Sequence, residues 1–223
     1  MFKQLGQRGE VLVLGSNVKK KEPNQSGADR APLTEEYLQE HTVGELTPLA
    51  SPIRVVDYDP EWPRRFELEA NKIRSALGDS ALLVEHVGST AVPDLPAKPI
   101  IDIVLLVTDA AREAEYLPGL ELTGYRLRIR EAEWHEHRML NSLDPDVNLH
   151  VFSNGCAEVR RMLEFRDWLR FNTRDRELYA RSKRELAQRD WKYVQNYADA
   201  KTGVIAEIIS RMQRAQRRIL EPD

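Results

Sequence analysis

The sequence has little cysteine and no long apolar segment. Cys156 is the only cysteine among 223 residues, which excludes an internal disulfide and a zinc site made of several cysteines. No apolar run approaches the roughly 20 residues that a membrane-spanning helix requires. The N-terminus lacks a continuous apolar stretch followed by a small-residue cleavage site, so no signal peptide is predicted. We therefore expect a soluble cytoplasmic protein that has no membrane partner.

The chain also lacks a surplus of positive charge, because 36 Asp and Glu outnumber 33 Lys and Arg and leave a net charge of −3. An acidic chain has no general attraction for nucleic acid, and no series of base-stacking aromatic residues is present. Nucleic-acid binding is therefore not expected. Residues 158–219 differ, since they hold 16 bases and 9 acids. This surplus fits either a surface that faces phosphate groups or solvated helices with ion pairs.

The first 50 residues are not expected to form a hydrophobic core. Residues 17–32 are polar and include Pro, Gly and Ser but no aromatic residue, so burial cannot offset the entropy lost on ordering. Residues 10–14 could form a lone strand, which is too short to be stable outside a sheet. Residues 33–42 are consistent with a short helix capped by Thr34.

Regular structure is predicted from residue 53 onward. Apolar runs and alternation predict strands at residues 53–56, 82–87, 100–107, 125–130, 138–140 and 147–152. Helical spacing predicts helices at residues 59–78, 109–117 and 158–219, with breaks near 172–175 and 189–191. A mixed sheet followed by helices belongs to the α+β class. The predicted division is a flexible N-terminal extension over 1–50, an α/β core over 51–156 and C-terminal helices packed on the core over 157–220.

The densest set of polar residues lies in the string EHVGSTAVPDLPAKPIIDI. A strand ends at Gly88, Ser89 and Thr90, where glycine permits close backbone approach and the hydroxyls and amides can bind phosphate. A loop with Lys98 then leads to an apolar strand whose carboxylate, Asp102, is costly to bury without a metal or a cation. The combination predicts a metal–phosphate site. The alternative is a structural carboxylate that accepts hydrogen bonds from backbone amides.

A second set of polar residues lies on the strand DVNLHVF. Asp146, Asn148 and His150 share one face of this strand, which is either exposed to solvent or part of a cleft. His135 and His137 alternate nearby as zinc ligands do, but no quartet of Cys and His completes such a site. We interpret these two as surface histidines.

A third set consists of bases on helical stripes. Arg166 and Lys201 each interrupt an apolar stripe, and Lys183 follows Tyr179 at i,i+4. A base in such a place either extends its side chain to solvent or points at an acid or anion. Solvent exposure explains any one of them. Two such bases on different helices favour a shared anion site, and we predict that Arg166 and Lys201 point into the cleft that holds Asp102.

Three strings resemble the GrpB family: HVGSTAVPDLPAKPIIDI, VNLHVFSNGCAEVRRMLEFRDWLR and YADAK. The similarity runs from about residue 53 to residue 212 and leaves out the first 50 residues. The resemblance implies a fold of the nucleotidyltransferase superfamily, a small mixed sheet with helices. In that fold a Gly-Ser turn is followed, about a dozen residues on, by a strand with acidic residues that bind divalent metal. Some family members are fused to dephospho-CoA kinase.

The resemblance assigns roles to particular residues. Gly88 and Ser89 match the Gly-Ser turn, and Asp102 matches the first strand acid. Val104 stands where enzymes of the superfamily usually have a second acid, although two-metal phosphoryl transfer needs carboxylates for both ions. Three other side chains are candidate substitutes: Glu85, Asp146 and His150.

Two functional hypotheses follow. The first is a nucleotidyltransferase-like enzyme that binds a nucleoside triphosphate with Mg²⁺ or Mn²⁺ and transfers a nucleotidyl group to a small-molecule acceptor. Asp102 would hold the metal, and His150 would be a metal ligand or a general base. The candidate substrate- and phosphate-binding residues are His86, Gly88, Ser89, Thr90, Lys98, Arg138, Arg166, Lys183 and Lys201. The second hypothesis is a degenerate accessory domain that binds a nucleotide or a CoA-like ligand without turnover. The missing second acid favours the second, and the polar residues around Asp102 favour the first.

Overall fold

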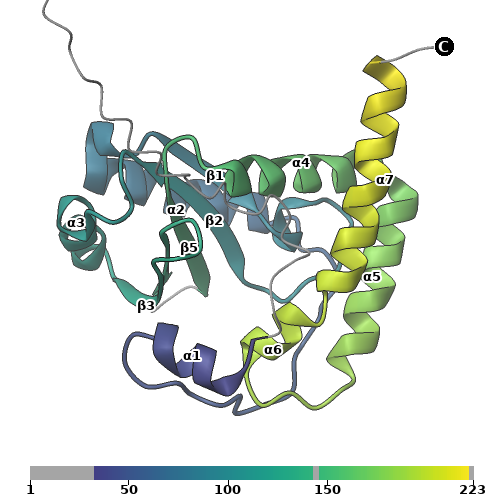
Figure 1. The fold of residues 1–223 in the computed structure, drawn as a ribbon, viewed down its shortest axis with the longest axis horizontal. Coiled ribbons are helices and arrows are strands. Elements are labelled where there is room, and N and C mark those ends of the chain that lie inside the picture. Colours follow the sequence, from purple (N-terminus) through teal and green to yellow (C-terminus); the bar gives the residue numbers. More distant parts are fainter. Residues whose placement is uncertain (1–32, 143–145, 221–223) are drawn as a thin grey trace, which may run out of the picture.

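A mixed β-sheet and the helices around it make up the computed structural model, which describes residues 33–142 and 146–220 (Figure 1). The strands are β1 (Leu83–Val87), β2 (Ile101–Val107), β3 (Tyr125–Glu131), β4 (His137–Ser142) and β5 (Val147–Ser153). The helices are α1 (Glu35–His41), α2 (Trp62–Leu77), α3 (Leu117–Leu122), α4 (Ala157–Phe171), α5 (Thr173–Ala187), α6 (Val194–Asp199) and α7 (Thr202–Leu220). The predicted α+β class is confirmed. No helix in the described residues is long and apolar enough to cross a membrane.

The strand order is β1-β2-β5-β4-β3. β2 and β5 run parallel, while the β1–β2, β4–β5 and β3–β4 pairs are antiparallel. The register places Asp102 beside Val87 on one side and Asn148 on the other, and it pairs Val104 with His150. Because side chains alternate along each strand, Asp102, Asn148 and His150 lie on the same face of the sheet.

Helices cover both faces of the sheet. α2 and α3 cover one face with a core that includes Trp62, Phe66, Ile73, Leu120, Ile103, Leu105 and Leu149. α4 covers the other face, where Val159 packs with Val87, Val104 and Phe152. The apolar run of β2 is therefore buried on both sides, as expected for a central strand with a parallel neighbour. Asp102 lies on the α4 side of this strand.

Local sequence signals account for the position of α2. The Asp59 carboxylate accepts a hydrogen bond from the Glu61 amide at 2.9 Å, and Pro63 occupies the first turn, where proline costs no hydrogen bond. The helix ends at Gly78, whose φ of 54° favours glycine. The helix predicted over 59–78 is present over Trp62–Leu77, so it begins three residues later than predicted.

Two predicted elements differ in the structure. Residues 53–56 form only one isolated bridge, between Val56 and Ala97, because their partner is a proline-rich loop rather than a strand. The helix predicted over 109–117 is replaced by a 3₁₀ turn at Glu113–Glu115 followed by α3. Pro118 in the first turn of α3 explains this shift, because proline is favoured there and disfavoured inside a helix. The turn predicted at Asp144-Pro145 lies outside the described residues.

Residues 33–50 pack against the rest of the fold, which corrects their assignment to a flexible extension. The Thr34 side chain caps α1, accepting from the Tyr37 amide at 3.2 Å. The Val43 amide donates to the Arg128 carbonyl at 2.8 Å and the Leu49 amide to the Lys192 carbonyl at 2.9 Å. These contacts join α1 and its loop to both β3 and the segment before α6 (Figure 1). The strand predicted at residues 10–14 lies outside the described residues.

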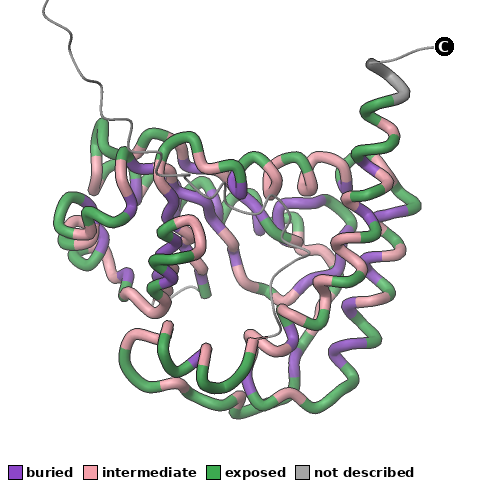
Figure 2. Tube along the Cα trace, viewed as in Figure 1, coloured by how far each residue is buried: buried purple, intermediate pink, exposed green. Residues whose placement is uncertain are grey.

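The C-terminal helices hold the loop between β1 and β2. Figure 2 shows α5 and α7 side by side with buried positions between them. Val92 and Leu95 of the loop pack with Leu169, Tyr179 and Ile208 of α4, α5 and α7. This apolar cluster fixes the loop that carries Lys98 toward Asp102.

Candidate functional site

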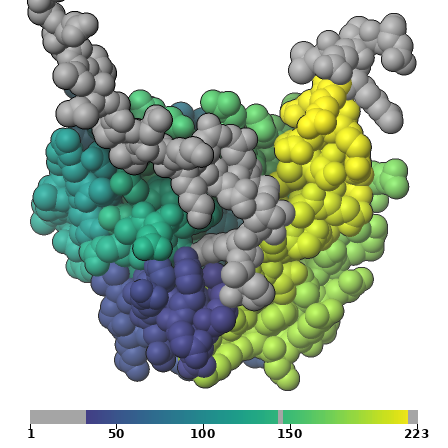
Figure 3. Space-filling model, in the orientation of Figure 1, coloured from purple at the N-terminus to yellow at the C-terminus, as the bar shows by residue number. Residues whose placement is uncertain are grey.

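A cleft of about 570 Å³ opens on the α4 side of the sheet. Asp102 and His150 of the central strands line it, together with Ser89 of the β1–β2 loop, Tyr37 of α1 and Lys201, which precedes α7. In Figure 3, α1 lies between the part of the surface formed by the strands and the part formed by the C-terminal helices. The cleft is therefore enclosed by segments from both ends of the described chain.

The Gly88 turn lies directly against the carboxylate of Asp102. A Cβ atom on Gly88 would overlap Asp102 Oδ2 and lie 3.0 Å from Asp102 Cβ. The φ of Gly88 is 70°, a conformation that L-residues rarely adopt. Ser89 follows immediately and begins a short 3₁₀ turn, Ser89–Ala91. Glycine at position 88 thus permits the close contact between the turn and the strand acid.

Asp102 is an ionised group at the base of the cleft. Its side chain is 29% exposed, and its Oδ1 atom accepts a hydrogen bond from Asn148 Nδ2 at 2.8 Å. Burial by itself would raise the pKa of Asp102, but His150, Asn148 and Lys201 outweigh it and hold the pKa below its usual value. His150 Nε2 lies 3.9 Å from Asp102 Oδ1.

Lys98, Lys183 and Lys201 also line the cleft. Burial lowers the pKa of each amine, that of Lys201 to about 8 and that of Lys183 well below its usual value, while the charge of Asp102 opposes the shift. Lys183 donates a hydrogen bond to the Pro96 carbonyl. The lining also includes the acids Glu45, Glu131 and Glu158 and the bases Arg128 and Arg161, so its acids and bases nearly balance. The amines close to Asp102 are the groups that a phosphate-bearing ligand would pair with.

His86 and Thr90 have structural partners. His86 packs on the α2 face of the sheet, where its ring stacks on Phe66 at 4.8 Å. The Thr90 hydroxyl donates to the Ile100 carbonyl at 3.1 Å, so His86 Nε2, at 3.0 Å, must donate to the same hydroxyl. Burial lowers the pKa of His86 to about 4. Thr90 lines the cleft, but its only hydroxyl proton is engaged in this network.

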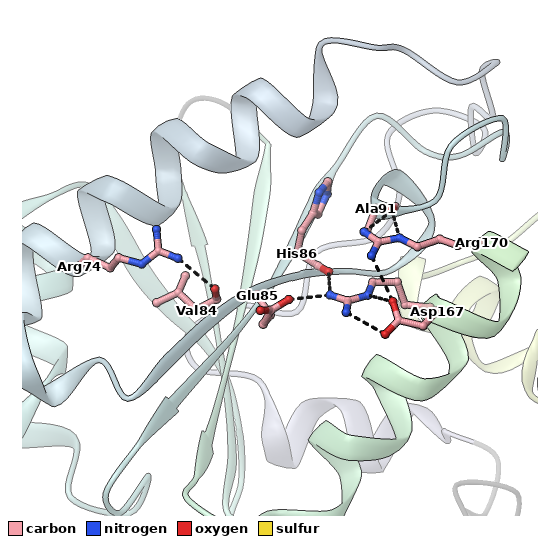
Figure 4. Close-up of polar contacts among 8 residues, drawn as sticks. Arg74, Val84, Glu85, His86, Ala91, Asp167 and Arg170 are labelled. Carbon is pink, nitrogen blue, oxygen red and sulfur yellow. Dashed lines mark hydrogen bonds and ion pairs between the residues drawn. The ribbon is translucent and has the colours of Figure 1, made fainter.

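Arg166 joins α4 to β1 and not to Asp102. Its Nη1 atom donates to Glu85 Oε2 at 2.7 Å and to the His86 carbonyl at 2.8 Å, and its Nε atom pairs with Asp167. These three partners are labelled in Figure 4. Of the two bases that were expected to converge on Asp102, Lys201 lines the cleft and Arg166 does not. The prediction for Arg166 is wrong, because its guanidinium is bound to acceptors on β1 and to Asp167.

Arg138 also lies apart from the cleft. It pairs with Val151 in the β4–β5 register, which puts its side chain on the α2 and α3 face of the sheet. The residue is buried, and its guanidinium donates to Glu113 Oε1 at 2.5 Å and to the Glu136 carbonyl at 2.7 Å. These partners indicate a structural role.

His137 is buried, so its interpretation as a surface histidine is wrong. Only 4% of the residue is exposed. Its Nδ1 atom lies 2.7 Å from Glu131 Oε2, and its Nε2 atom lies 3.0 Å from His150 Nδ1. Glu131 also accepts from the Tyr37 hydroxyl at 2.8 Å. The contact depends on the register that pairs Glu131 with His137 and Met139 with His150, which no local pattern in the sequence reveals.

The model of the GrpB protein family matches residues 52–211. The chain belongs to this family. A UPF0157 protein of Halalkalibacterium halodurans is 57% identical over 189 residues, which cover 85% of this chain and 97% of that protein. The crystal structure of conserved protein GrpB from Enterococcus faecalis matches with a TM-score of 0.64 and 30% identity, covering 75% of this chain and 100% of that one. A dephospho-CoA kinase of Mycolicibacterium paratuberculosis is 34% identical over 166 residues, which cover 62% of this chain and 40% of that protein.

The central GrpB strand β2 offers one carboxylate to the cleft. Val104, at the position of the absent second acid, is fully buried against Val87, Phe152 and Val159. Of the candidate substitutes, Glu85 is bound by Arg166 and His150 lies beside Asp102. In residues 33–142 and 146–220, no three His, Cys, Asp or Glu side chains gather as a metal cluster would.

This set of residues fits one divalent ion and not two. Mg²⁺ is commonly held by one or two carboxylates, and water and substrate phosphates complete its coordination. Asp102 meets that minimum, and Gly88 and Ser89 of the adjacent turn line the same cleft, where their backbone amides are candidate donors to a phosphate oxygen. A two-ion centre needs further carboxylates, and the packing around Val104 leaves no place for one on β2.

Proposed function

We propose that the cleft binds a nucleoside triphosphate with one divalent ion, and that the protein transfers a nucleotidyl group to a small-molecule acceptor. The observation that carries the proposal is the contact of the Gly88 turn with the ionised carboxylate of Asp102. A backbone turn without a side chain, an ionised acid and nearby amines are the groups that a metal–triphosphate complex requires.

Each residue has a defined task in this proposal. Asp102 would hold the ion, Mg²⁺ or Mn²⁺, which offsets the negative charge of the phosphates when it is bound. Ser89 and the adjacent amides would bind phosphate oxygens. Lys98 and Lys201 would neutralise the charge that develops on the leaving pyrophosphate. Because these amines are partly buried, their charge is screened less by water than that of surface lysines.

A second candidate function is binding without turnover, as an accessory domain for a nucleotide or a CoA-like ligand. The buried position of Val104 favours it, since the second ion of two-metal transfer has no carboxylate there. The similarity to part of a dephospho-CoA kinase is consistent with such a role beside a CoA-related activity. Both functions use the same phosphate-binding groups, so they differ in turnover and not in the site.

Calorimetry with ATP and Mg²⁺ or Mn²⁺ tests the binding site. The wild-type protein should bind the complex, and Asp102→Asn should weaken binding at least about tenfold, because it removes the charge and keeps the volume. Asp109→Asn is the matched control, since Asp109 lies beyond the other end of β2 and pairs with Arg112. Equal affinity of the wild type and Asp102→Asn would remove Asp102 as the metal ligand.

Pyrophosphate release separates the two candidate functions. Each of the four nucleoside triphosphates is incubated with the protein and a divalent ion, with and without a small-molecule cell extract. Release that depends on the extract and on Asp102 supports nucleotidyl transfer. Nucleotide binding without any release supports the accessory role. The absence of nucleotide binding contradicts nucleotidyl transfer and restricts the accessory role to a CoA-like ligand.

A further inference from the structure

A buried chain of hydrogen bonds ends at the cleft beside Asp102. It runs from Glu131 Oε2 to His137 Nδ1 at 2.7 Å and from His137 Nε2 to His150 Nδ1 at 3.0 Å. The remaining ring nitrogen of this series, His150 Nε2, faces Asp102 Oδ1 at 3.9 Å. Glu131 and His137 are 5% and 4% exposed, so the chain is shielded from solvent up to His150.

Metal binding requires neutral imidazoles, and with both rings neutral the direction of each hydrogen bond is fixed. An ionised carboxylate only accepts, so the proton between Glu131 and His137 is on His137 Nδ1. A neutral His137 then accepts through Nε2, and His150 must donate from Nδ1. A neutral His150 therefore has a lone pair on Nε2, and that lone pair is directed into the cleft. The 3.9 Å distance to Asp102 Oδ1 is too long for a hydrogen bond.

Aromatic packing holds the two imidazole rings in place. His137 stacks on Phe152 with ring centroids 4.8 Å apart, and its ring is within 17° of parallel to that of His150, with centroids 5.2 Å apart. The Trp134 ring meets His137 edge-on at 5.2 Å. A histidine that binds a metal usually donates a hydrogen bond from its second ring nitrogen to a neighbour, and this bond fixes the tautomer.

We propose that His150 Nε2 and the Asp102 carboxylate together bind one divalent transition-metal ion, with Glu131 and His137 as positioning residues. Two bonds of about 2.2 Å can span the distance between the two ligand atoms. An imidazole ligand disfavours Mg²⁺, which takes oxygen ligands, and favours ions that also accept nitrogen. The site is therefore selective for an ion such as Mn²⁺ over Mg²⁺. This inference rests on the proposed function, because phosphate oxygens complete the coordination.

The charges around the site determine how the ion binds. Lys98 and Lys201 interact with the charge of Asp102, and these amines repel a free cation. The ion alone therefore binds weakly, and its affinity rises when a polyphosphate neutralises the amines. Inorganic triphosphate is the suitable probe because it supplies phosphate oxygens but contains no nitrogen.

Pulsed electron paramagnetic resonance on the full chain with Mn²⁺ and inorganic triphosphate tests the proposal directly. We expect a coupling from a directly bound imidazole nitrogen in the wild-type protein and no such coupling in His150→Asn. His135→Asn is the matched control, because it removes a nearby histidine that is outside the chain of hydrogen bonds. A wild-type spectrum without imidazole coupling overturns the proposal, whatever the stability of the variants.

Titration calorimetry tests the positioning pair. The wild type should bind Mn²⁺ in the presence of triphosphate at least about tenfold more tightly than Mg²⁺. His137→Gln should lower the Mn²⁺ affinity about 10- to 100-fold, the usual effect of losing a neighbour that orients a ligand, and should change the Mg²⁺ affinity little. If His137→Gln lost the same factor of affinity for Mn²⁺ and for Mg²⁺, His137 would have only a structural role.

The outcomes distinguish this inference from the proposed function. If nucleotide binding depends on Asp102 but the spectrum shows no imidazole coupling and the protein does not prefer Mn²⁺, then His150 is not a ligand. The proposed function remains in place in that case. Imidazole coupling with triphosphate, but no binding of any nucleoside triphosphate, confirms the metal site and contradicts the proposed function.

Discussion

A side chain at Gly88 would occupy the space of the Asp102 carboxylate. We therefore expect Gly88→Ala to displace Asp102 and to abolish metal-dependent nucleotide binding. The φ of 70° adds backbone strain of about 1 kcal/mol or more to the cost in stability. Nucleotide binding by calorimetry and the free energy of unfolding in urea measure the two effects separately.

Gly155→Ala is the matched control for this substitution. Gly155 also has a positive φ, 81°, but no atom lies within 4 Å of a Cβ placed on it. The control should lose a similar amount of stability and keep its affinity for nucleotide. If both variants lost affinity equally, backbone strain and not the contact with Asp102 would account for the result.

The amine of Lys201 should make nucleotide binding depend on pH. Burial lowers the pKa of Lys201 to about 8, so the amine is mostly charged at pH 7 and mostly neutral at pH 9. Phosphate binds the charged form, so affinity should fall about tenfold from pH 7 to pH 9. Lys201→Arg, which stays charged throughout, should flatten this dependence. If the affinity of Lys201→Arg for nucleotide fell with pH as steeply as that of the wild type, another group would be the one that titrates.

A second acid at position 104 should destabilise the protein. Val104 is fully buried in an apolar cluster, so Val104→Asp leaves an unpaired carboxylate there, at a cost of about 3 kcal/mol or more. Val104→Thr, which has a similar shape and no charge, should cost less. Denaturation in urea compares the two. Equal stability, with tighter metal binding by the aspartate variant, would show that the fold accepts a second acid.

His86 should make the protein less stable in mild acid. Its pKa is about 4 in the folded protein and about 6.5 in an unfolded chain. As pH falls below 6.5, the unfolded chain takes up a proton that the folded protein binds only near pH 4. From pH 7 to pH 5 the free energy of unfolding should therefore fall by about 2 kcal/mol from this group. His86→Gln should remove this part of the slope, and His135→Gln should retain it.

The strands and the main helix were predictable because their signals are local. The apolar run of β2, the alternation on β5, and the proline and glycine near the two ends of α2 are each local to one element. The same alternation placed Asn148 and His150 on one face of β5. The Gly88 turn and Asp102 were predicted as part of a site because a Gly-Ser turn follows a strand there and because a carboxylate interrupts an apolar strand.

The remaining parts of the site depend on contacts between distant residues. The position of Arg166 within an apolar helical stripe predicted that its side chain would reach the cleft. In the structure its guanidinium is bound instead to Glu85, which lies 81 positions away in sequence. The burial of His137 depends on how β3, β4 and β5 align. The packing of residues 33–50 depends on contacts with residues far away in sequence, because α1 and its loop are joined by hydrogen bonds to β3 and to the segment before α6.

The position of α1 restricts the shape of the ligands that the cleft admits. Tyr37 ties this helix to Glu131 on one wall, and Glu35 ties it to Tyr193 near α6 on the other. A long polymer lying along the cleft would have to thread beneath the helix, whereas a molecule of metabolite size need only enter at the rim. If α1 must loosen before a ligand enters, the observed rate of binding should reach a plateau as ligand concentration rises.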